Sequence, residues 1–436
     1  MNNILQEGIY YKNNQRAGNS FSIIFLQVSE GSTADEIGLV LKELWSMYEE
    51  LKMGIQRDIK EVNKRHWYSG NLSILIGYGP RVFSIDGCRR QKPSGLEYHK
   101  KFSNPFSRGG GPIIEGSSIS YADDIRINHV SFEHLLLQFI GDDNLTVNRA
   151  IVETWKLLST FKNKQNEHVL SISKIYEGFQ RNDGRSWLGF HDGVSNLASK
   201  DRFRAIAISN KALNVNDLWT ENGTYMSFIR IAIDLDKWQR IEKEIQEIII
   251  GRDKITGCPI IGKDSNGKPI KDARCPVKGT HEVIERGNEV FREYPQIGST
   301  VYKPISSYEK NLEYSHISRA KLSNINIRQD SSIKIYRQGF EFFESLDSFP
   351  GFRVGLNFIS YQNDPSKLIR ILQEGFGRNI HTNKESNTLE DYFSVRSAGI
   401  FLVPPLATND LFPGMSIFLD SSKTIVKSVD YRTSWK

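Results

Sequence analysis

Three segments of the sequence carry side chains that could together do proton and metal chemistry. Residues 189–196 read Gly-Phe-His-Asp-Gly-Val-Ser-Asn and place Asp192 in a turn whose glycines permit close backbone approach. Residues 315–320 read Ser-His-Ile-Ser-Arg-Ala and contain His316, and Arg337 follows further along the chain. A carboxylate can carry a proton, a neutral imidazole can bind a metal, and a guanidinium keeps its charge at any working pH. Together they are the groups that peroxide reduction at a haem iron requires.

Each of these residues also has an ordinary interpretation when it is taken alone. Asp and Gly are common in turns, so Asp192 could be an Asx-turn carboxylate. A single histidine is more often a surface or core residue than a ligand, and most of the 57 Lys and Arg are expected to be surface cations. His191 is a rival ligand, but residues adjacent in the chain cannot easily serve opposite faces of a haem. The haem hypothesis therefore depends on the three segments occurring together.

In this hypothesis each side chain has a defined role. His316 would hold the iron through a neutral ring nitrogen. Asp192, when ionised, would take a proton from peroxide and return it to the oxygen that leaves as water. Arg337 would stabilise the charge on that departing oxygen. Because the base must be ionised, activity is expected to fall only at acidic pH.

Composition limits the class of protein. With 436 residues, 39% of them hydrophobic, the chain can bury a sizeable core in two or three domains or in one duplicated domain. The net charge of +6 comes without any run of five or more Lys or Arg, which argues against nucleic-acid binding. No apolar run approaches the ~18–20 residues of a membrane span. The N-terminus has neither a signal peptide nor a twin-arginine segment. We therefore expect a cytoplasmic protein that does not bind a membrane.

Other cofactors have weaker signals in the sequence. Cys258 and Cys275 could close one loop, which would leave Cys88 unpaired, and three cysteines do not make a disulfide framework. The pairs Cys258-Pro259 and Cys275-Pro276 could be haem-responsive, although plain loop cysteines are favoured. Zinc is disfavoured because no Cys-x-x-Cys or His-x-x-x-His spacing accompanies them. The chain also has no Walker-type loop and no Rossmann fingerprint.

The apolar pattern of the first half predicts the order β-α-β-β-α-β, which is that of a ferredoxin-like module. Strands are indicated by β-branched and aromatic runs, and helices by apolar residues at helical spacing. The predicted strands are 21–28, 71–79, 134–141 and 169–177, and the predicted helices are 33–52 and 145–162.

The second half repeats part of this pattern. Strands are predicted at 225–233, 352–361 and 398–403, and helices at 236–250 and 367–375. Residues 251–350 look loop-like, and a long irregular region inside a compact protein usually carries function. We therefore expect an α+β protein of two ferredoxin-like modules, antiparallel sheets with helices, at residues 1–210 and 211–436.

Six segments, in this order, resemble the dye-decolourising (DyP-type) haem peroxidase family across nearly the whole chain. Residues 189–196 are similar to its Gly-Phe-x-Asp-Gly-x-x-Asn signature, and residues 315–320 to its axial histidine segment. The other four are 5–9, 223–230, 251–259 and 355–362. The resemblance implies paired ferredoxin-like modules with haem b, the haem lying in the C-terminal half. It also implies a peroxidase that uses hydrogen peroxide to oxidise small organic donors such as dyes and phenols.

The resemblance implies roles for particular residues. His316 would be the proximal ligand of the haem iron, with Asp192 and Arg337 as the distal pair. A carboxylate usually supports the proximal histidine, and Glu390 and Asp391 are both candidates, since a shift of one residue reverses which side chain points inward. The other residues implied to contact the haem or shape its pocket are Gly189, Phe190, Gly193, Asn196, Arg319, Leu356 and Phe358.

Some points stay open at the level of sequence. Leu197 stands where the family usually has Pro, and residues 320–322 read Ala-Lys-Leu instead of Ala-Asn-Pro, which puts local contacts at the haem edge in doubt. Trp187, Tyr314 and Tyr336 lie near site residues in sequence, a hint of radical relays. A haem-handling, deferrochelatase-like protein with incidental peroxidase activity is the alternative function, and a homo-oligomer remains open.

Overall fold

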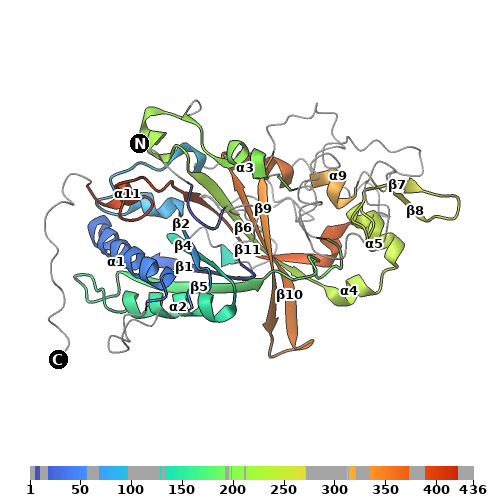
Figure 1. The fold of residues 1–436 in the computed structure, drawn as a ribbon, viewed down its shortest axis with the longest axis horizontal. Helices are drawn as coiled ribbons and strands as arrows, with labels where there is room; N and C mark the ends of the chain where they lie inside the picture. The colour runs from blue at the N-terminus through green and yellow to red at the C-terminus, as the bar shows by residue number, and fades with distance from the viewer. Residues whose placement is uncertain are drawn as a thin grey trace.

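The computed structural model is built around one large sheet, which spans both halves of the chain. It describes residues 5–9, 18–55, 68–96, 128–129, 133–191, 196–197, 199–210, 213–271, 312, 314–320, 334–372 and 388–420. The sheet has nine strands in the order β2-β4-β1-β5-β9-β10-β6-β11-β3. Figure 1 shows α1 and α2 at one end of the molecule, with α4, α5 and α9 at the other.

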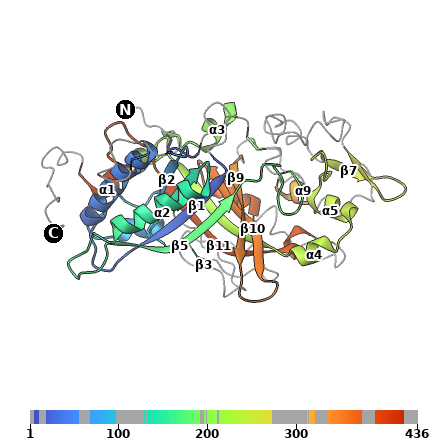
Figure 2. The same ribbon diagram turned by 60° about the horizontal axis from the view of Figure 1, so that its bottom comes forward.

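The first half forms the predicted β-α-β-β-α-β module. Its elements are β1 (Ser20–Val28), α1 (Ala34–Lys52), β2 (Ser73–Tyr78), β4 (Leu135–Gly141), α2 (Asn144–Leu158) and β5 (Leu170–Phe179). The four strands are antiparallel neighbours in the order β2-β4-β1-β5. The helix α1 begins with a capping box in which Thr33 and Glu36 bond each other's backbone N–H. Both helices cover the same face of this sheet (Figure 2).

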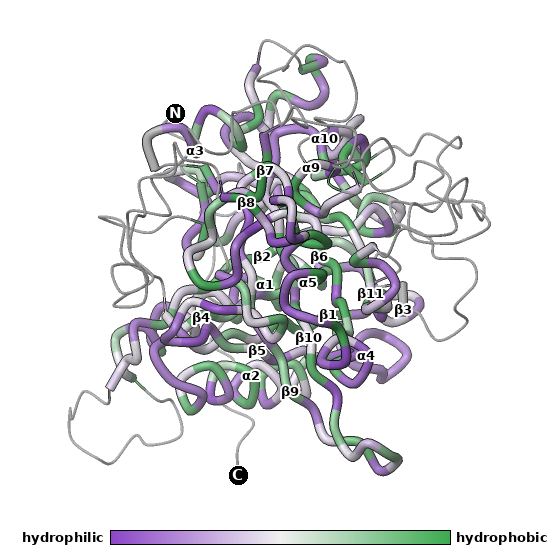
Figure 3. The backbone as a smooth tube through the Cα atoms, turned by 90° about the vertical axis from the view of Figure 1, so that its right-hand side faces the viewer, coloured by the Kyte–Doolittle hydropathy of each residue, from purple (hydrophilic) through white to green (hydrophobic). Residues whose placement is uncertain are grey.

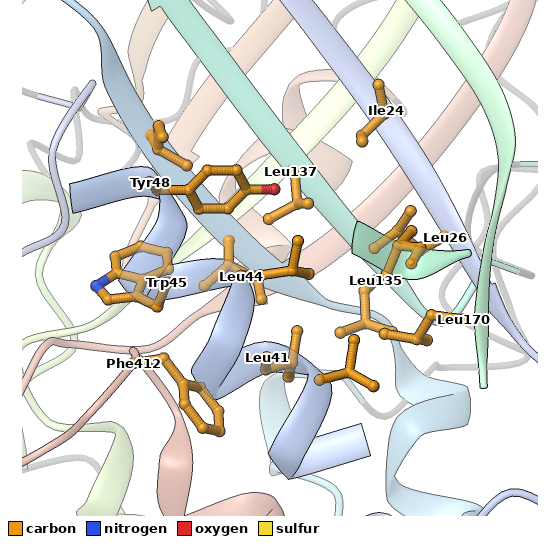
Figure 4. Packing of buried hydrophobic residues seen from close by; sticks show 14 of the residues in the cluster. Ile24, Leu26, Leu41, Leu44, Trp45, Tyr48, Leu135, Leu137, Leu170 and Phe412 are labelled. Atoms are coloured by element: carbon orange, nitrogen blue, oxygen red, sulfur yellow. The ribbon is translucent and has the colours of Figure 1, made fainter. Parts of the chain in front are cut away.

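Apolar residues at helical spacing on α1 explain how it packs on this sheet. Alternate residues of the strands point toward the helices, as the twofold period of a strand requires. The cluster in Figure 4 brings together Leu41, Leu44, Trp45 and Tyr48 of α1 with Ile24, Leu26, Leu135, Leu137 and Leu170 of the strands. At its centre the buried Tyr48 hydroxyl lies 2.7 Å from the hydroxyl of Thr154 on α2.

The second half has the same strand arrangement, β9-β10-β6-β11. Its elements are β6 (Thr224–Ile233), α4 (Leu235–Gln239), α5 (Lys243–Ile250), β9 (Tyr336–Ser345), β10 (Phe352–Gln362), α10 (Ser366–Arg370) and β11 (Phe393–Val403). The prediction that 251–350 are loop-like is wrong for β9, and the predicted helix 236–250 is two helices. Arg240 ends α4, and Glu242, in a non-helical conformation, caps α5. The predicted boundary at 210/211 stays a prediction.

The two halves are joined edge to edge. β5 meets β9 through the pair Phe179 and Glu341, and β2 meets β11 through Tyr78 and Leu402, so the sheet closes on itself. A second core lies between the two halves. It includes Phe21, Phe25, Leu136, Phe228, Phe340, Tyr361 and Phe401. In Figure 3 the hydrophobic stretches of the chain gather in the strands, and hydrophilic stretches follow the outer turns.

The N-terminal segment bridges the junction between β2 and β11. The side chain of Gln6 donates to the carbonyls of Ile76 at 3.0 Å and Pro404 at 2.8 Å, and it accepts from the amide of Ile76. Gln338 on β9 donates to the carbonyl of Gly8 at 2.8 Å. Residues 5–9 thus connect β2 with the end of β11 and with β9.

Shorter elements complete the fold. They are the 3₁₀ turns η2 (Pro80–Ser84), η3 (Ser94–Leu96), η6 (Val215–Thr220) and η10 (Leu389–Tyr392), the helices α3 (Ser199–Ile206), α9 (His316–Ala320) and α11 (Met415–Phe418), and the strands β3 (Asn128–His129), β7 (Ile260–Lys263) and β8 (Pro269–Lys271). Among the described residues, no helix combines the length and apolar character needed to cross a membrane.

The buried His134 makes stability depend on pH. Its Nδ1 accepts the backbone N–H of Val28 at 3.2 Å, and burial together with the charge of Arg81 lowers its pKa to about 4. The unfolded chain, with an ordinary His pKa of about 6.5, therefore takes up the proton first as pH falls from there toward 4. The free energy of unfolding should therefore fall across this window. We expect a loss of about 1–2 kcal/mol, smaller than the full pKa difference implies, because solvent near the ring screens part of its charge.

Urea unfolding at pH 7 and pH 4.5 would measure this loss. His134→Asn is the matched control, because an amide oxygen can replace the ring acceptor without titrating. The variant should lose less stability than wild type between the two pH values, and an equal loss would contradict the assignment.

Candidate functional site

The candidate site gathers at the end of the molecule that carries α5 and α9 (Figure 1). His316 is the first residue of α9, Arg337 is the second residue of β9, and Glu390 lies in η10. The predicted acid–base Asp192, and Gly193 after it, lie outside the described residues. The described residues nearest to them are His191 before and Asn196 after.

The surroundings of His316 keep its ring neutral. Its Nδ1 is buried, although the residue as a whole is partly exposed. Burial first, and then the positive charges of Arg337, Arg319 and Arg252, lower its pKa to about 3. The charge of Arg337 thus contributes to keeping the ring of His316 neutral. A neutral imidazole is the form that binds a metal.

Arg252 is a site residue that the sequence hypothesis did not single out. It is 5% exposed, its Nη1 donates to the carbonyl of Gly257 at 2.8 Å, and burial and the charge of Arg337 lower its pKa to about 9. It follows Gly251, which ends α5 with a left-handed φ of +84°. That glycine–arginine pair at a helix end was the signal available in the sequence. A buried guanidinium with a second arginine close enough to lower its pKa suits an anionic ligand, because an anion would offset the repulsion between the two charges.

Asn196 joins the Asp192 segment to Arg337. Its Nδ2 donates to the carbonyl of Arg337 at 2.7 Å, and its Oδ1 accepts the N–H of Arg337 at 3.1 Å. The side-chain amide therefore pairs with this backbone as a neighbouring strand would. Two segments that are far apart in the sequence therefore meet at Asn196 and Arg337.

The turn before Asp192 is tightly packed. Gly189 has a φ of +85°, a left-handed conformation that favours glycine, and a Cβ there would also displace the flexible end of the Lys254 side chain. Phe190 is 5% exposed and meets Trp238 edge to face with centroids 6.3 Å apart. His191, the rival ligand, places Nε2 3.0 Å from the carbonyl of Ile255. That nitrogen is thus engaged with the backbone as a donor.

The two candidate proximal carboxylates face different ways. Glu390 Oε2 accepts from Nη1 of Arg319 at 2.7 Å, and Arg319, on the same short helix as His316, is 1% exposed. Asp391 is exposed, and its Oδ2 caps η10 by accepting the N–H of Thr388 at 3.1 Å. Of the two, Glu390 is therefore the one directed toward α9.

The predicted pocket residues share one face of β10. Leu356 and Phe358 are both partly buried, and Phe358 packs in a cluster that includes Ala320 of α9. The intervening Asn357 faces the other way and is fully buried. Its Oδ1 accepts from Nη1 of Arg230 at 2.6 Å, and its Nδ2 donates to the carbonyl of Glu177 on β5 at 2.9 Å.

We expect Asn357→Leu to destabilise the protein by about 1–3 kcal/mol, because the buried charged donor of Arg230 loses its acceptor. Urea unfolding would measure the change. Asn148→Leu, at an exposed position of α2, is the control and should change stability by less than about 0.5 kcal/mol. Similar effects of the two substitutions would show that Asn357 does not support β10.

The three aromatic residues near the site differ in exposure. Tyr336 is fully buried, stacks on Tyr361 with centroids 6.3 Å apart, and lies 4.5 Å from the guanidinium of Arg202. Trp187 and Tyr314 are partly exposed, and the indole N–H of Trp187 donates to the carbonyl of Phe342 at 3.1 Å. Only the latter two could pass electrons directly to a donor at the surface.

The two described cysteines differ in their bonding, in agreement with one of the possibilities left open by the sequence. Cys88 is a free thiol, whereas Cys258 is part of a disulfide bond. Cys275 lies outside the described residues.

Comparison with known proteins identifies the class. The family model described as "Dyp-type peroxidase, C-terminal" matches residues 183–408, more than half of the chain. The chain therefore belongs to the DyP-type peroxidase family. Among curated proteins it is similar to a deferrochelatase of Shigella flexneri serotype 5b (24% identical over 346 residues) and one of Escherichia coli K12 (23% over 346 residues). In both cases the match covers 77% of this chain and 66% of the relative.

Solved structures share the fold. Ferric DtpA from Streptomyces lividans superposes with a TM-score of 0.63 at 18% identity, covering 92% of each chain. A DyP-type peroxidase from Streptomyces coelicolor gives 0.62 at 19% identity, again with 92% of each chain. The encapsulated DyP-type peroxidase from Mycobacterium smegmatis gives 0.57 at 16% identity, with 93% of this chain and 96% of that one. The predicted α+β fold of paired ferredoxin-like modules is confirmed.

Proposed function

We propose that this protein is a haem-dependent peroxidase that reduces hydrogen peroxide and oxidises small organic donors in one-electron steps. One observation carries the proposal. The side chain of Asn196 ties the segment after Asp192 to the backbone of Arg337, and the charge of Arg337 acts on the buried, neutral ring of His316. Asn196, Arg337 and His316 come from three parts of the sequence and interact in this way, which supports the proposal.

The residues present fit haem b. The neutral ring of His316 would bind the iron, and buried Arg252 with its neighbour Arg337 would offset the negative charge of haem carboxylates. Glu390, directed toward α9 by its ion pair with Arg319, would support the histidine. When bound, haem supplies the iron at which peroxide is reduced.

The other residues would act on the peroxide. Asp192 takes a proton from one peroxide oxygen and delivers it to the other, which leaves as water. Arg337 stabilises the charge that develops on the departing oxygen. Leu356 and Phe358 would limit the space available to peroxide, and the remaining predicted contacts (Gly189, Phe190, Gly193, Asn196 and Arg319) would help to hold the haem.

The proposal is tested by the absorption spectrum of the purified protein before and after one equivalent of hydrogen peroxide. We expect a ferric haem band that changes within seconds and returns when a phenolic donor is added. Asp192→Asn should bind haem equally well but respond at least about 100-fold more slowly. A protein that takes up no added haem would contradict the proposal.

A second candidate function is haem handling, because the curated relatives are named deferrochelatases. In that case the protein would take iron from haem and leave the porphyrin intact, and peroxidase turnover would be incidental. Release of iron from bound haem under reducing conditions, measured with a ferrous chelator, would favour this function. Fast donor oxidation without iron release would favour the peroxidase.

A further inference from the structure

The short helix α9, which begins with His316, is fastened near its other end by a buried ion pair. Nη1 of Arg319 donates to Oε2 of Glu390 in η10 at 2.7 Å, and the two side chains are 2% and 15% exposed. We propose that Arg319 and Glu390 act as one unit that positions α9 and, with it, the histidine that would bind the haem iron. This inference rests on the proposed function, and it makes Arg319 a positioning residue instead of a direct contact of the haem.

The helix α9 is too short to fix its own position. It spans only the five residues His316–Ala320, and isolated helices shorter than about 12 residues are marginal in water. Its local hydrogen bonds are few: the N–H of Arg319 donates to the carbonyl of Ser315 at 3.0 Å, and Oγ of Ser315 donates to the carbonyl of Leu312 at 2.7 Å. The place of His316 therefore depends on contacts between α9 and the rest of the fold.

The start of α9 is held by the end of α5. Gly251 ends α5, and a Cβ at this position would lie 2.7 Å from Cγ1 of Ile317 and 3.0 Å from Cβ of Ser315. Side-chain atoms do not normally pack so closely, so the two segments approach each other because residue 251 is a glycine. This contact fixes the residues on both sides of His316 and leaves the end of α9 to the ion pair.

The turn η10 gives Glu390 a fixed position. The carbonyl of Tyr392, the last residue of η10, accepts the N–H of Asp234 at 2.8 Å. The ring of Tyr392 meets Trp238 of α4 edge to face, with centroids 5.2 Å apart. Because η10 is joined to α4 in this way, the ion pair ties α9 to a part of the fold that is itself held in place.

The burial of the ion pair makes its two members depend on each other. A buried charge that loses its partner is strongly disfavoured, because neither water nor an opposite charge replaces that partner. Arg319 is 1% exposed, so its guanidinium cannot reach water unless α9 moves away from η10. Loss of either partner should therefore displace α9, and His316 with it, although neither residue is the proposed iron ligand.

A different arrangement would have the two residues act separately, with Arg319 contacting the haem and Glu390 accepting from the ring of His316. The two arrangements predict different results when both residues are changed. Residues that act as one unit have effects that do not add, whereas the effects of independent contributions multiply in an affinity. A double variant therefore distinguishes a shared positioning role from two separate contacts.

The experiment measures the affinity for added haem of the full chain and of Arg319→Met, Glu390→Gln and the double variant. Methionine removes the charge and keeps an unbranched stem, and glutamine keeps the shape of the carboxylate. Each single substitution should weaken haem binding by about 10- to 100-fold, the usual effect of removing a residue that supports a ligand. The double variant should bind haem no more weakly than the weaker single variant, because the second substitution removes nothing that the first leaves in place.

Two further measurements separate positioning from general stability. In the haem-free proteins, the backbone amides of residues 318 and 319 should exchange hydrogen faster in both single variants. Arg319→Lys, which keeps a cation facing Glu390, should bind haem more tightly than Arg319→Met. Arg240→Met is the matched control, because Arg240 pairs with Asp236 at 2.6 Å on the exposed surface of α4. It should change neither the exchange nor the haem affinity.

The outcomes separate the inference from the function on which it rests. Faster exchange with wild-type haem affinity would make the pair purely structural and overturn the proposal. A loss in the double variant equal to the product of the two single losses would also overturn it. If Arg319→Met does not fold, Arg319→Lys and Glu390→Gln replace it, and wild-type haem affinity in both would contradict the inference. If the wild-type chain binds no haem, or His316→Ala binds it equally well, the proposed function itself fails, whereas the exchange data still report whether the pair holds α9.

Discussion

Arg337→Leu should slow the reaction with hydrogen peroxide by about 100- to 1,000-fold while the protein keeps its haem, which is the cost of removing one donor to a developing anion. The physical reason is that charge builds on the departing oxygen, and a guanidinium next to a buried site stabilises it without reorganising. Leucine keeps much of the volume of the stem. Stopped-flow absorbance after mixing with peroxide would measure the rate constant per bound haem.

The control for this prediction is Arg353→Leu on β10. The Nη1 of Arg353 pairs with Glu344 of β9 at 2.8 Å. It should react at close to the wild-type rate. Because the charge of Arg337 also lowers the pKa of Arg252 and of His316, both pKa values should rise toward their ordinary ranges in Arg337→Leu. A wild-type peroxide rate in Arg337→Leu would remove this residue from the proposed mechanism.

The modules could be predicted from the sequence because their elements have strong local patterns. The helix α1 has apolar residues at helical spacing and a capping box, and β1 is a continuous run of β-branched and aromatic residues. β9 was missed because Arg337, Gly339 and Glu341 interrupt its apolar positions, although Tyr336, Gln338 and Phe340 alternate on its buried face. Its partner β10 supplies the pairing that the local pattern does not reveal.

Contacts within the site depend on pairs that are distant in sequence, and for that reason spacing alone could not predict them. Asn196 and Arg337 are 141 residues apart, and Arg319 and Glu390 are 71 apart. The sequence could not decide between Glu390 and Asp391. The structure separates them because Asp391 caps the 3₁₀ turn η10, whereas Glu390 contacts Arg319. Arg252 could have been found only through the glycine–arginine pair that ends α5, because its side chain donates to a backbone carbonyl that any residue supplies.

His316→Ala should weaken haem binding by more than about 100-fold, since changes to residues that only support a ligand already cost about 10- to 100-fold. Burial and the charges of three guanidinium groups keep the ring of His316 neutral, which is the form that can bind iron. Glu390→Gln should have the smaller effect of a supporting residue. Titration of the haem-free proteins with haem, followed by absorbance, would give the three affinities.

His191→Ala is the decisive comparison, because His191 is the rival ligand from the sequence. Its Nε2 lies 3.0 Å from the carbonyl of Ile255, so this nitrogen holds the turn to residue 255. Burial also lowers the pKa of His191, which favours its neutral form. We therefore expect this variant to keep its haem while its reaction with peroxide slows. Added imidazole should restore haem binding to His316→Ala by replacing the missing nitrogen. If His191→Ala loses the haem and His316→Ala retains it, the two histidines have exchanged roles and the proximal side of the site must lie on the Asp192 segment.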